Sequence, residues 1–366
     1  MSAGNSVGDG AGEDGGWGRL AHAWPPLGVR GRIRVRPQDF TVSEELGFRP
    51  DGEGEHGLLR VRKTGCNTQW VARTLARAGG VSARDVGYAG LKDRHAVTEQ
   101  WFSVPARAIE PLRATDLGHS GIEILDTARH RRKLRRGAHR ANRFRIVVRD
   151  LAADDGDLAG LEDRLGVVAE RGVPNYFGPQ RFGRDGGNLD LIPRIAGGQR
   201  VNRQQRGFAL SAARSYLFNA VLSARVAQGS WDRLLPGDLA MLHGSRSTFP
   251  VTVTDPTLER RLSEHDIHPS GPLWGRGGSP AGADVGALED ETARSWSDGV
   301  EVLSAAGLDQ ERRALRLTVA DLSWDFEGQS LILGFDLGKG GFATAVLREL
   351  IDLGEAPGQD LLRNRT

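Results

Sequence analysis

Hydrophobic and polar positions alternate in several short segments of the first 150 residues, which is the pattern of half-buried β-strands. β-branched and aromatic residues are frequent in these segments, and Pro37 divides the first of them. The segments are RIRVRPQDFTVSEELGF (32–48), GLLRVRK (57–63), VTEQWFSV (97–104), GIEIL (121–125) and RFRIVVRDL (143–151). The pattern predicts a strand-rich sheet for the first part of the chain.

A few helices are expected among these strands, and the one that the sequence locates begins directly after residue 66. Asn67 or Thr68 can cap its start, and Gly79-Gly80 can end it. The residues expected to line its buried face are Trp70, Val71, Leu75 and Ala78.

Beyond Asp150 the three- and four-residue spacing of helices dominates. Helices are expected over 157–172, which Asp157 can cap, over 209–228 and over 342–352. The segment 275–296 is rich in glycine, alanine and acidic residues and is expected to be a loop, and strand character returns over 314–337. We therefore expect a sheet-based domain built from both ends of the chain, with a mostly helical insert between them.

The composition is that of a folded chain without disulfides. With 366 residues, of which 39% are hydrophobic, the chain can bury a substantial core, and two domains are the first expectation. The single cysteine, Cys66, excludes an internal disulfide and any multi-cysteine metal site. No run approaches the ~20 apolar residues of a membrane span, and the glycine-rich start lacks the features of a signal peptide. We expect a cytoplasmic, monomeric protein without a structural metal, with an unstructured lead over residues 1–24.

Positive charge is concentrated in one tract, although the formal net charge is only +2. The tract Arg129–Arg145 holds nine Arg or Lys, two His and no acidic residue. Because like charges repel, an anionic partner stabilises such a tract, and a nucleic-acid backbone is the usual candidate. Asn142 can hydrogen-bond a base edge, and Phe144 can stack on an exposed base of an RNA. The pattern favours RNA binding, and a solvated charge run is the alternative.

The turn GYAGLKDRHAVTEQW, residues 87–101, is the best candidate for chemistry. Asp93 lies between Lys92 and Arg94 in the sequence, and neighbouring cations favour the ionised form of a carboxylate. An ionised carboxylate suits a nucleophile or a base. The alternative is an ordinary loop whose local ion pairs contribute little, and residue types alone favour this alternative.

Three other motifs are expected to be structural. GEGEHG (52–57) has the glycine spacing of a dinucleotide-binding loop, but its glutamates would repel a pyrophosphate and a strand follows it, so a hairpin turn is expected. GFDLGKGG (334–341) is not a phosphate-binding loop, although its glycines could place the following Phe342 at a site. His265 and His268 have no evident third metal ligand nearby, so a surface or capping role is expected.

The turn at residues 87–101 closely resembles the signature of the TruD family of tRNA pseudouridine synthases. Further blocks resemble that family, in the family's order, between about residues 37 and 352. These blocks are PQDFTVSEELGF (37–48), GCNTQWVARTLA (65–76), ARHRRKLRRG (128–137), ANRF (141–144), GVPNYFGPQRFGRDGGN (172–188), LSAARSYLFNAVLSARV (210–226) and GFATAVLREL (341–350). Blocks of this length in this order are not expected by chance.

The resemblance implies a role for each matching residue. Asp93 matches the family's catalytic aspartate. The positions that contact the target uridine are matched by Phe40, Asn142 and Phe342, and their active-site neighbours by Glu44, Lys92 and Phe144. The basic residues that would hold the RNA backbone are Arg131, Arg132, Lys133, Arg135 and Arg136. The family needs no cofactor, and no metal site is implied.

The family fold implies an α+β protein with two domains. A pseudouridine-synthase-type catalytic domain with a mixed, largely antiparallel sheet would take residues 25–171 and 316–366, and an inserted, mostly helical α/β domain would take residues 172–315. The implied activity is isomerisation of uridine to pseudouridine in tRNA, at position 13, by breaking the C1′–N1 bond and rejoining the base through C5. A non-catalytic RNA-binding or RNA-folding protein is the main alternative, and an enzyme acting on another RNA is the second.

Overall fold

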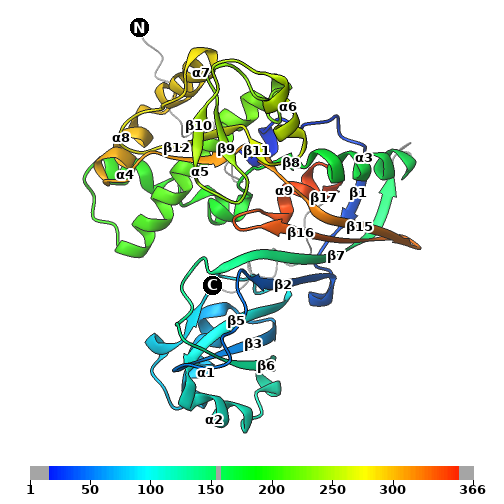
Figure 1. Ribbon diagram of the computed structural model, residues 1–366, viewed down its shortest axis with the longest axis vertical. Helices are drawn as coiled ribbons and strands as arrows, with labels where there is room; N and C mark the ends of the chain where they lie inside the picture. Colours follow the sequence, from blue (N-terminus) through cyan, green and yellow to red (C-terminus); the bar gives the residue numbers. More distant parts are fainter. Residues whose placement is uncertain (1–15, 154–157, 354–366) are drawn as a thin grey trace. The chain divides into compact units, whose positions relative to one another are not determined.

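The computed structural model of the protein describes residues 16–153 and 158–353, which divide into two compact units (Figure 1). The sheet unit consists of residues 27–153, 158–169, Val319–Ala343 and 350–353. The helical unit consists of residues 16–26, Glu170–Thr318 and Thr344–Glu349. Each unit is therefore assembled from segments that are far apart in the sequence.

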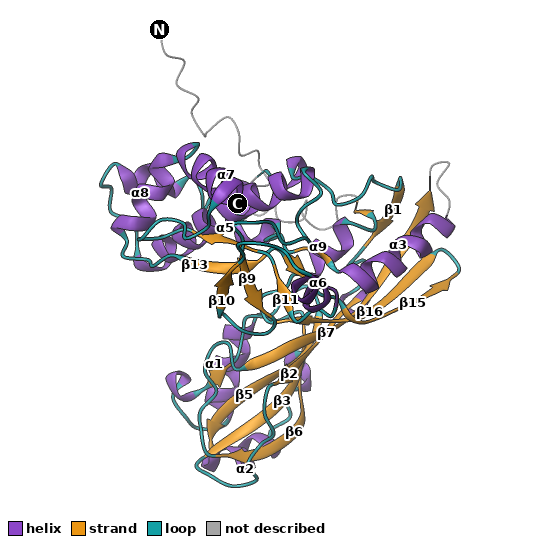
Figure 2. Ribbon diagram, turned by 45° about the horizontal axis from the view of Figure 1, so that its top comes forward, coloured by secondary structure: helices purple, strands orange, loops and turns teal. Residues whose placement is uncertain are grey.

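A ten-stranded sheet forms the body of the sheet unit, as Figure 2 shows. Its continuous order is β15-β16-β7-β2-β5-β3-β6, and β1, β17 and β4 pair at its margins. Among its described strand pairs only β1–β17 and β2–β5 are parallel, which confirms the expected mixed, largely antiparallel sheet and the α+β class. Its strands are β1 (Val29–Arg32), β2 (Phe40–Leu46), β3 (His56–Thr64), β4 (Gly87–Tyr88), β5 (Val97–Pro105), β6 (Ile122–His130), β7 (His139–Ala153), β15 (Ala320–Glu327), β16 (Ser330–Gly338) and β17 (Asp352–Leu353).

The long strand β7 joins the early and late parts of the sequence in this sheet. It pairs with β2 on one side and with β16 on the other. Phe144 of β7 lies opposite Val42 of β2 and Phe335 of β16, and its ring stacks on Phe335 at 5.4 Å between centroids. Burial of these side chains fixes the register, because a shift of one residue would turn them to the other face.

Two helices, α1 (Thr68–Ala78) and α2 (Ile109–Arg113), pack on β3 and β5. The Asn67 side chain accepts a hydrogen bond from the Trp70 amide at 2.8 Å, so the expected cap is present. Val71 and Leu75 are fully buried, whereas Trp70 is 36% exposed. The expectation that Trp70 lines the buried face is wrong, because adjacent helical residues point about 100° apart.

The segment 52–57 is not a hairpin turn, which corrects the expectation from its sequence. It connects β2 to β3, but β5 lies between these strands, parallel to β2 and antiparallel to β3. The segment instead lies against the end of β6. At Gly54 (φ +117°) a Cβ atom would come within 2.4 Å of the His130 carbonyl oxygen, so only glycine permits this approach.

The helical unit is organised around α5 (Arg203–Ala227), which Asn202 caps by accepting from the Gln205 amide at 2.8 Å. The remaining elements are short. The helices are α4 (Leu191–Ala196), α6 (Pro256–Ser263), α7 (Ala283–Arg294), α8 (Ser297–Ala305) and α9 (Ala343–Arg348), and α3 (Leu158–Arg171) leads into the unit. The strands are β8 (Val173–Pro174), β9 (Leu239–Leu242), β10 (Thr248–Pro250), β11 (Ile267–His268), β12 (Ser270–Leu273), β13 (Glu311–Ala314) and β14 (Arg316–Leu317).

Helix α7 lies within the segment that was expected to be a loop. Its Val285 and Glu289 side chains are buried, and Glu289 forms an ion pair with Arg312 of β13 at 2.8 Å. Tertiary contacts therefore stabilise a helix that the glycine- and acid-rich composition does not indicate. The C-terminal helix is also shorter than expected, since α9 spans only Ala343–Arg348, and the expected cap Asp157 lies outside the described residues.

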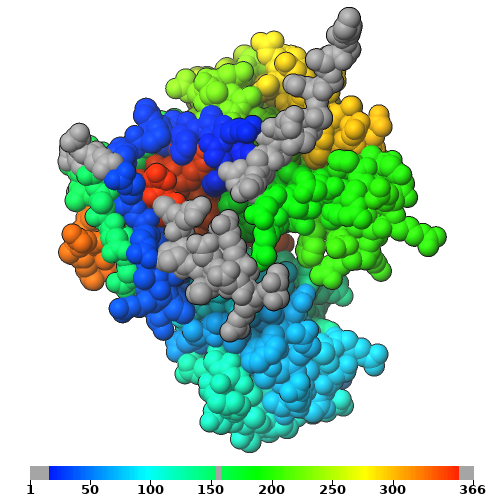
Figure 3. All heavy atoms as spheres, turned by 180° about the vertical axis from the view of Figure 1, so that it is seen from behind, coloured from blue at the N-terminus to red at the C-terminus, as the bar shows by residue number. Residues whose placement is uncertain are grey.

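Residues 16–24, expected to belong to an unstructured lead, pack within the helical unit, whereas residues 1–15 lie outside the described residues. Tyr176 donates from its hydroxyl to the Ala21 carbonyl, and the Ala23 amide donates to Glu349, both at 2.9 Å. Figure 3 shows this dark-blue segment beside the red residues near 349. Trp24 packs edge-on against Trp231 at 5.9 Å, so aromatic burial anchors a segment whose mean composition suggests disorder.

Within the described ranges, no helix is long and apolar enough to cross a membrane. The same residues contain no group of three or more His, Cys, Asp and Glu side chains arranged to hold a metal ion.

Candidate active site

Asp93 lies in the turn between β4 and β5, and its side chain is 47% exposed. Its Oδ2 accepts from Nη2 of Arg34 at 2.5 Å. The Arg34 guanidinium also lies over the Phe40 ring, 4.2 Å from its centroid, where a cation interacts favourably with the π system. Arg34 therefore links the Asp93 turn to the aromatic start of β2.

The cations next to Asp93 in the sequence point elsewhere, which corrects the expectation that they flank the carboxylate. Arg94 donates from Nε to the Gly65 carbonyl at 3.1 Å, and Lys92 points towards β2 and β7. The cation that contacts the carboxylate, Arg34, lies 59 residues away in the sequence. It adopts a left-handed backbone conformation (φ +58°), which is uncommon for a non-glycine residue.

Lys92, Glu44 and Asn142 form a second polar cluster, buried beside the turn. Lys92 Nζ lies 2.9 Å from Glu44 Oε2 and donates to Asn142 Oδ1 at 2.8 Å. The sheet register brings these partners together, because Glu44 of β2 pairs directly with Asn142 of β7. Burial raises the pKa of the Glu44 carboxyl, and the Lys92 charge opposes that effect.

The two aromatic residues predicted from the early motifs lie together in the sheet unit. Phe40 and Phe144 are buried and contact each other edge-to-face at 6.1 Å between ring centroids. Phe342 lies beyond β16, whose Leu337 pairs with Asn142. The strand pairing therefore brings the segment that leads to Phe342 alongside the predicted substrate-contacting amide.

The main chain of the turn is held by buried polar side chains that the sequence analysis missed. The Lys92 amide donates to Thr68 Oγ1 at 2.9 Å, and the Gln100 amide nitrogen donates to the Gly90 carbonyl at 2.5 Å. Lys63 Nζ donates to the carbonyls of Asp93 and Cys66 at 2.8 and 2.7 Å. Burial lowers the pKa of Lys63 to about 8.

One of these missed residues carried a detectable signal. Lys63 shares the two-residue period of Leu59 and Val61, so the strand pattern places a lysine on the buried face. A buried lysine is unusual enough to mark a candidate position. Arg34 has no such signal, because its contact with Asp93 depends on the folded sheet.

The middle of the basic tract, residues 131–138, is a loop between β6 and β7, and the ends of the tract belong to these two strands. Leu134 is its buried anchor, and its amide donates to Ser103 Oγ at 2.9 Å. The side chains of the basic residues around it are exposed: Arg131, Arg132, Lys133, Arg135 and Arg136. Of these, Arg131 pairs with Glu53 of the β2–β3 connection, whereas Arg132 and Arg135 form no salt bridge in the described part of the chain.

His268 is part of a buried network in the helical unit, which corrects the expected surface or capping role. Its Nε2 lies 2.9 Å from Nδ1 of His243, and its Nδ1 accepts from Nε of Arg316 at 3.0 Å. Burial and the Arg316 charge lower the pKa of His268 to about 3. Both ring nitrogens are engaged, so this histidine is a structural element of the core.

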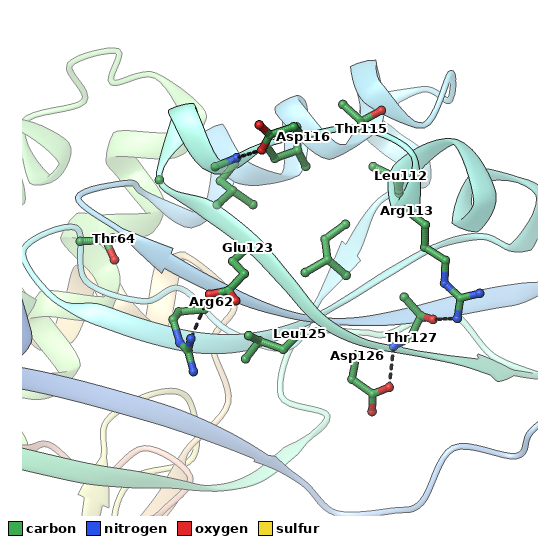
Figure 4. Close-up of a pocket in the computed structure, with 15 residues that line it drawn as sticks. Arg62, Thr64, Leu112, Arg113, Thr115, Asp116, Glu123, Leu125, Asp126 and Thr127 are labelled. Atoms are coloured by element: carbon green, nitrogen blue, oxygen red, sulfur yellow. Dashed lines mark hydrogen bonds and ion pairs between the residues drawn. The ribbon is translucent and has the colours of Figure 1, made fainter.

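A cavity of about 670 Å³ lies between β6 and α2, and it contains none of the predicted site residues. Figure 4 shows that its charged side chains engage each other or the wall: Arg62 pairs with Glu123, and Arg113 donates to Thr127. Because none of the residues predicted for the site lines this cavity, the exposed Asp93 turn is the better candidate for catalysis.

Comparison with known proteins shows which family this chain resembles. The family model for tRNA pseudouridine synthase D (TruD) matches residues 18–195 and 196–350. The tRNA pseudouridine synthase D of Nitrosococcus oceani is 48% identical over 348 residues, covering 94% of this chain and 96% of its own. That of Methylococcus capsulatus is 48% identical over 342 residues, covering 92% of this chain and 95% of its own.

The fold is shared with a crystal structure of TruD from Methanosarcina mazei. The TM-score is 0.71 at 22% sequence identity, over 90% of this chain and 95% of that one. The family match spans nearly all of the described residues, including the Asp93 turn and the Glu44–Lys92–Asn142 cluster. The chain belongs to the TruD family of tRNA pseudouridine synthases.

Proposed function

We propose that this protein converts uridine to pseudouridine in tRNA, at position 13, with Asp93 as the catalytic carboxylate. The observation that carries the proposal is an exposed aspartate fixed at 2.5 Å by Arg34 and flanked by a buried Lys92–Glu44–Asn142 cluster, in a chain of this family. Such an arrangement gives one reactive carboxylate a defined orientation while leaving it open to a large substrate.

The reaction needs little besides that carboxylate and a means of holding the base. The C1′–N1 bond breaks, positive charge develops on the sugar, and the base turns so that C5 can bond to C1′. A base then removes the C5 hydrogen as a proton, and N1, which has lost its bond to the sugar, takes up a proton. Ionised Asp93 would attack C1′ or stabilise the developing charge. The overall change is an isomerisation, so electrons and atoms balance without a redox partner, and we propose no cofactor and no metal.

The remaining predicted residues would hold the flipped nucleotide and the RNA. A uridine stacked in folded tRNA must leave the stack to reach Asp93. We propose that Asn142 hydrogen-bonds the uracil edge and that Phe40, Phe144 or Phe342 supplies an aromatic surface for it, with Glu44 and Lys92 holding Asn142 in place. The exposed cations of the β6–β7 loop would contact the phosphate backbone.

The domain roles are also part of this proposal. We propose that residues 25–171 and 316–366 act as the catalytic domain and that residues 172–315 are an inserted domain that contributes to tRNA recognition. We propose that the protein acts as a monomer, in the cytoplasm, where its RNA substrate is found.

Tritium release from tRNA that carries 5-³H-uridine tests the proposal directly. Rejoining through C5 expels the tritium, so wild-type protein should release it and Asp93→Asn should not. Replacement of uridine 13 by cytidine should abolish release from a tRNA that is otherwise unchanged. Wild-type protein that binds tRNA tightly without releasing tritium would favour the non-catalytic RNA-binding alternative, and release from other RNAs would favour the broader enzyme.

A further inference from the structure

Lys63 is a buried cation for which the reaction outlined above has no use. Its side chain is fully buried in β3, between Thr98 of β5 and Ile122 of β6. A methionine or leucine would fill the same space without the cost of removing a charge from water. A lysine in this position therefore requires a specific reason.

The reason lies in the two carbonyl groups that Nζ contacts. One is the main-chain oxygen of Asp93, at 2.8 Å, and the other is that of Cys66 in the β3–α1 connection, at 2.7 Å. Lys63 therefore ties the peptide of the candidate catalytic residue to the end of a buried strand. Hydrogen bonds from a charged donor are roughly twice as strong as those from a neutral one.

Contacts at three consecutive residues hold this turn. The Lys92 amide donates to Thr68, the Asp93 carbonyl accepts from Lys63, and the Arg94 side chain donates to Gly65. Together they fix the backbone on both sides of the Asp93 side chain, whose carboxylate is left to Arg34 and the substrate. Among these three contacts, the one from Lys63 is made by a buried, titratable group.

We propose that Lys63 is a positioning residue for catalysis, which holds the main chain of Asp93 in its productive place and releases it partially when it loses its proton. The inference rests on the proposed catalytic role of Asp93. The ionisable and charged groups facing Lys63 are Cys66, Asp93 and Lys92, while the residues opposite it on β5 and β6 are uncharged. Burial lowers the pKa of Lys63 to about 8, so Lys63 loses its proton within a pH range in which the enzyme can be assayed.

The test compares Lys63→Met, which keeps the volume and removes the donors, with wild-type protein. Single-turnover rates of tritium release are measured from pH 6 to 9.5, with tRNA affinity measured in parallel. At pH 7 we expect the rate to fall by about 100-fold, as for a small misplacement of a reacting group, with affinity within about twofold of wild type. The rate ratio of wild type to variant should shrink to about 10-fold at pH 9.5, because neutral Lys63 is the weaker donor.

The comparison with the variant removes effects that both proteins share. Titration of the uracil ring affects wild type and variant alike, so it cancels in the ratio. Arg62→Met is the matched control, since Arg62 is adjacent on β3 but points to Glu99 and Glu123. A ratio that stays constant with pH, or a Lys63→Met rate equal to that of wild type, would overturn the proposal.

Hydrogen exchange gives a readout that does not depend on turnover. The amides of residues 92–96 should exchange faster in Lys63→Met and Lys63→Gln than in wild type at pH 7, and unchanged exchange in folded variants would refute the tether. If Lys63→Met fails to fold, the same test can be made on wild-type protein alone. After correction for the intrinsic pH dependence of amide exchange, residues 92–96 should exchange faster at pH 9.5 than at pH 7. Absence of tritium release from wild type at every pH would instead refute the proposed function, which the exchange result does not address.

Discussion

Two aspartate–arginine pairs in this protein show how differently the same ion pair can be used. Asp93 and Arg34 of the sheet unit are 47% and 21% exposed, and they contact each other through one hydrogen bond. Asp238 and Arg225 of the helical unit are 0% and 1% exposed, and they are joined by two hydrogen bonds at 2.8 and 3.0 Å.

The surroundings of the two pairs differ even more than their exposure. Arg225 also donates to the hydroxyl and carbonyl of Ser230 and to the carbonyl of Arg233, and Asp238 also accepts from the Leu235 amide. A buried pair must have its remaining donors and acceptors satisfied, because each unsatisfied one is costly. The Asp93 carboxylate keeps acceptor capacity facing solvent, and this open capacity distinguishes a candidate reactive group from a structural one.

The comparison predicts that Asp93→Asn removes activity and leaves stability almost unchanged. Loss of the ionised oxygen should lower the single-turnover rate of pseudouridine formation by at least about 1,000-fold. The free energy of unfolding should change by less than about 0.5 kcal/mol, since exposed pairs contribute little. Asp126→Asn, the same change at another exposed aspartate of the sheet unit, should leave both quantities near their wild-type values. Comparable rates for the two variants would remove Asp93 from the reaction.

The reverse pattern is expected for Asp238→Ala. Removing one partner leaves the Arg225 charge buried, which should lower the free energy of unfolding by about 3–5 kcal/mol. Urea titration followed by circular dichroism measures this loss, and the folded fraction at low temperature should retain the wild-type rate per molecule. A specific loss of rate in fully folded protein would show that the buried pair also serves catalysis.

The sequence pattern predicted the elements of both regions better than it predicted their contacts. Alternation of hydrophobic residues located β3, β5 and β7, and Asn67 was one of the two residues expected to cap the helix, because these signals are local. The resemblance to TruD placed Asp93, Glu44, Lys92 and Asn142 in one site, and the sheet register brings the last three into contact.

What the pattern could not supply depends on long-range packing. The Asp93–Arg34 pair spans 59 residues, and Arg34 has a left-handed backbone conformation. The local sequence indicated the neighbouring Lys92 and Arg94 as partners instead. Helix α7 forms because Glu289 meets Arg312, and the strand order places β5 between β2 and β3. Each of these outcomes follows from tertiary contacts that override local composition.

Lys63 is a third case, a buried cation that, unlike Arg225, has no carboxylate partner and donates only to main-chain carbonyls among its described hydrogen bonds. Its pKa in the folded protein, about 8, is below the ordinary lysine value of 10.5. Between these pH values the unfolded chain binds more protons than the folded chain, so this residue makes the free energy of unfolding rise with pH, by up to about 3 kcal/mol.

Stability and activity should therefore change in opposite directions above pH 8. The rise in stability with pH is measured as the difference in unfolding free energy between wild type and Lys63→Met, from pH 7 to 10.5. The contributions of other titrating groups cancel in this difference. If Lys63 had an ordinary pKa, this difference in unfolding free energy would not change between pH 7 and 10.5. That result would contradict the proposal that loss of the Lys63 proton loosens the Asp93 turn.

The smallest effects are expected on the exposed basic loop, where the same contrast between paired and open charges applies. Arg131 already pairs with Glu53, whereas Arg132 and Arg135 are exposed without a salt bridge in the described part of the chain. Arg132→Gln or Arg135→Gln should weaken tRNA binding a few-fold and reduce the slope of log affinity against log salt by about one. Arg131→Gln should change the slope less, because its charge is partly neutralised before RNA arrives. Filter binding over a range of salt concentrations distinguishes the three variants, and equal slopes for all of them would mean that the Glu53 pair opens at no cost when tRNA binds.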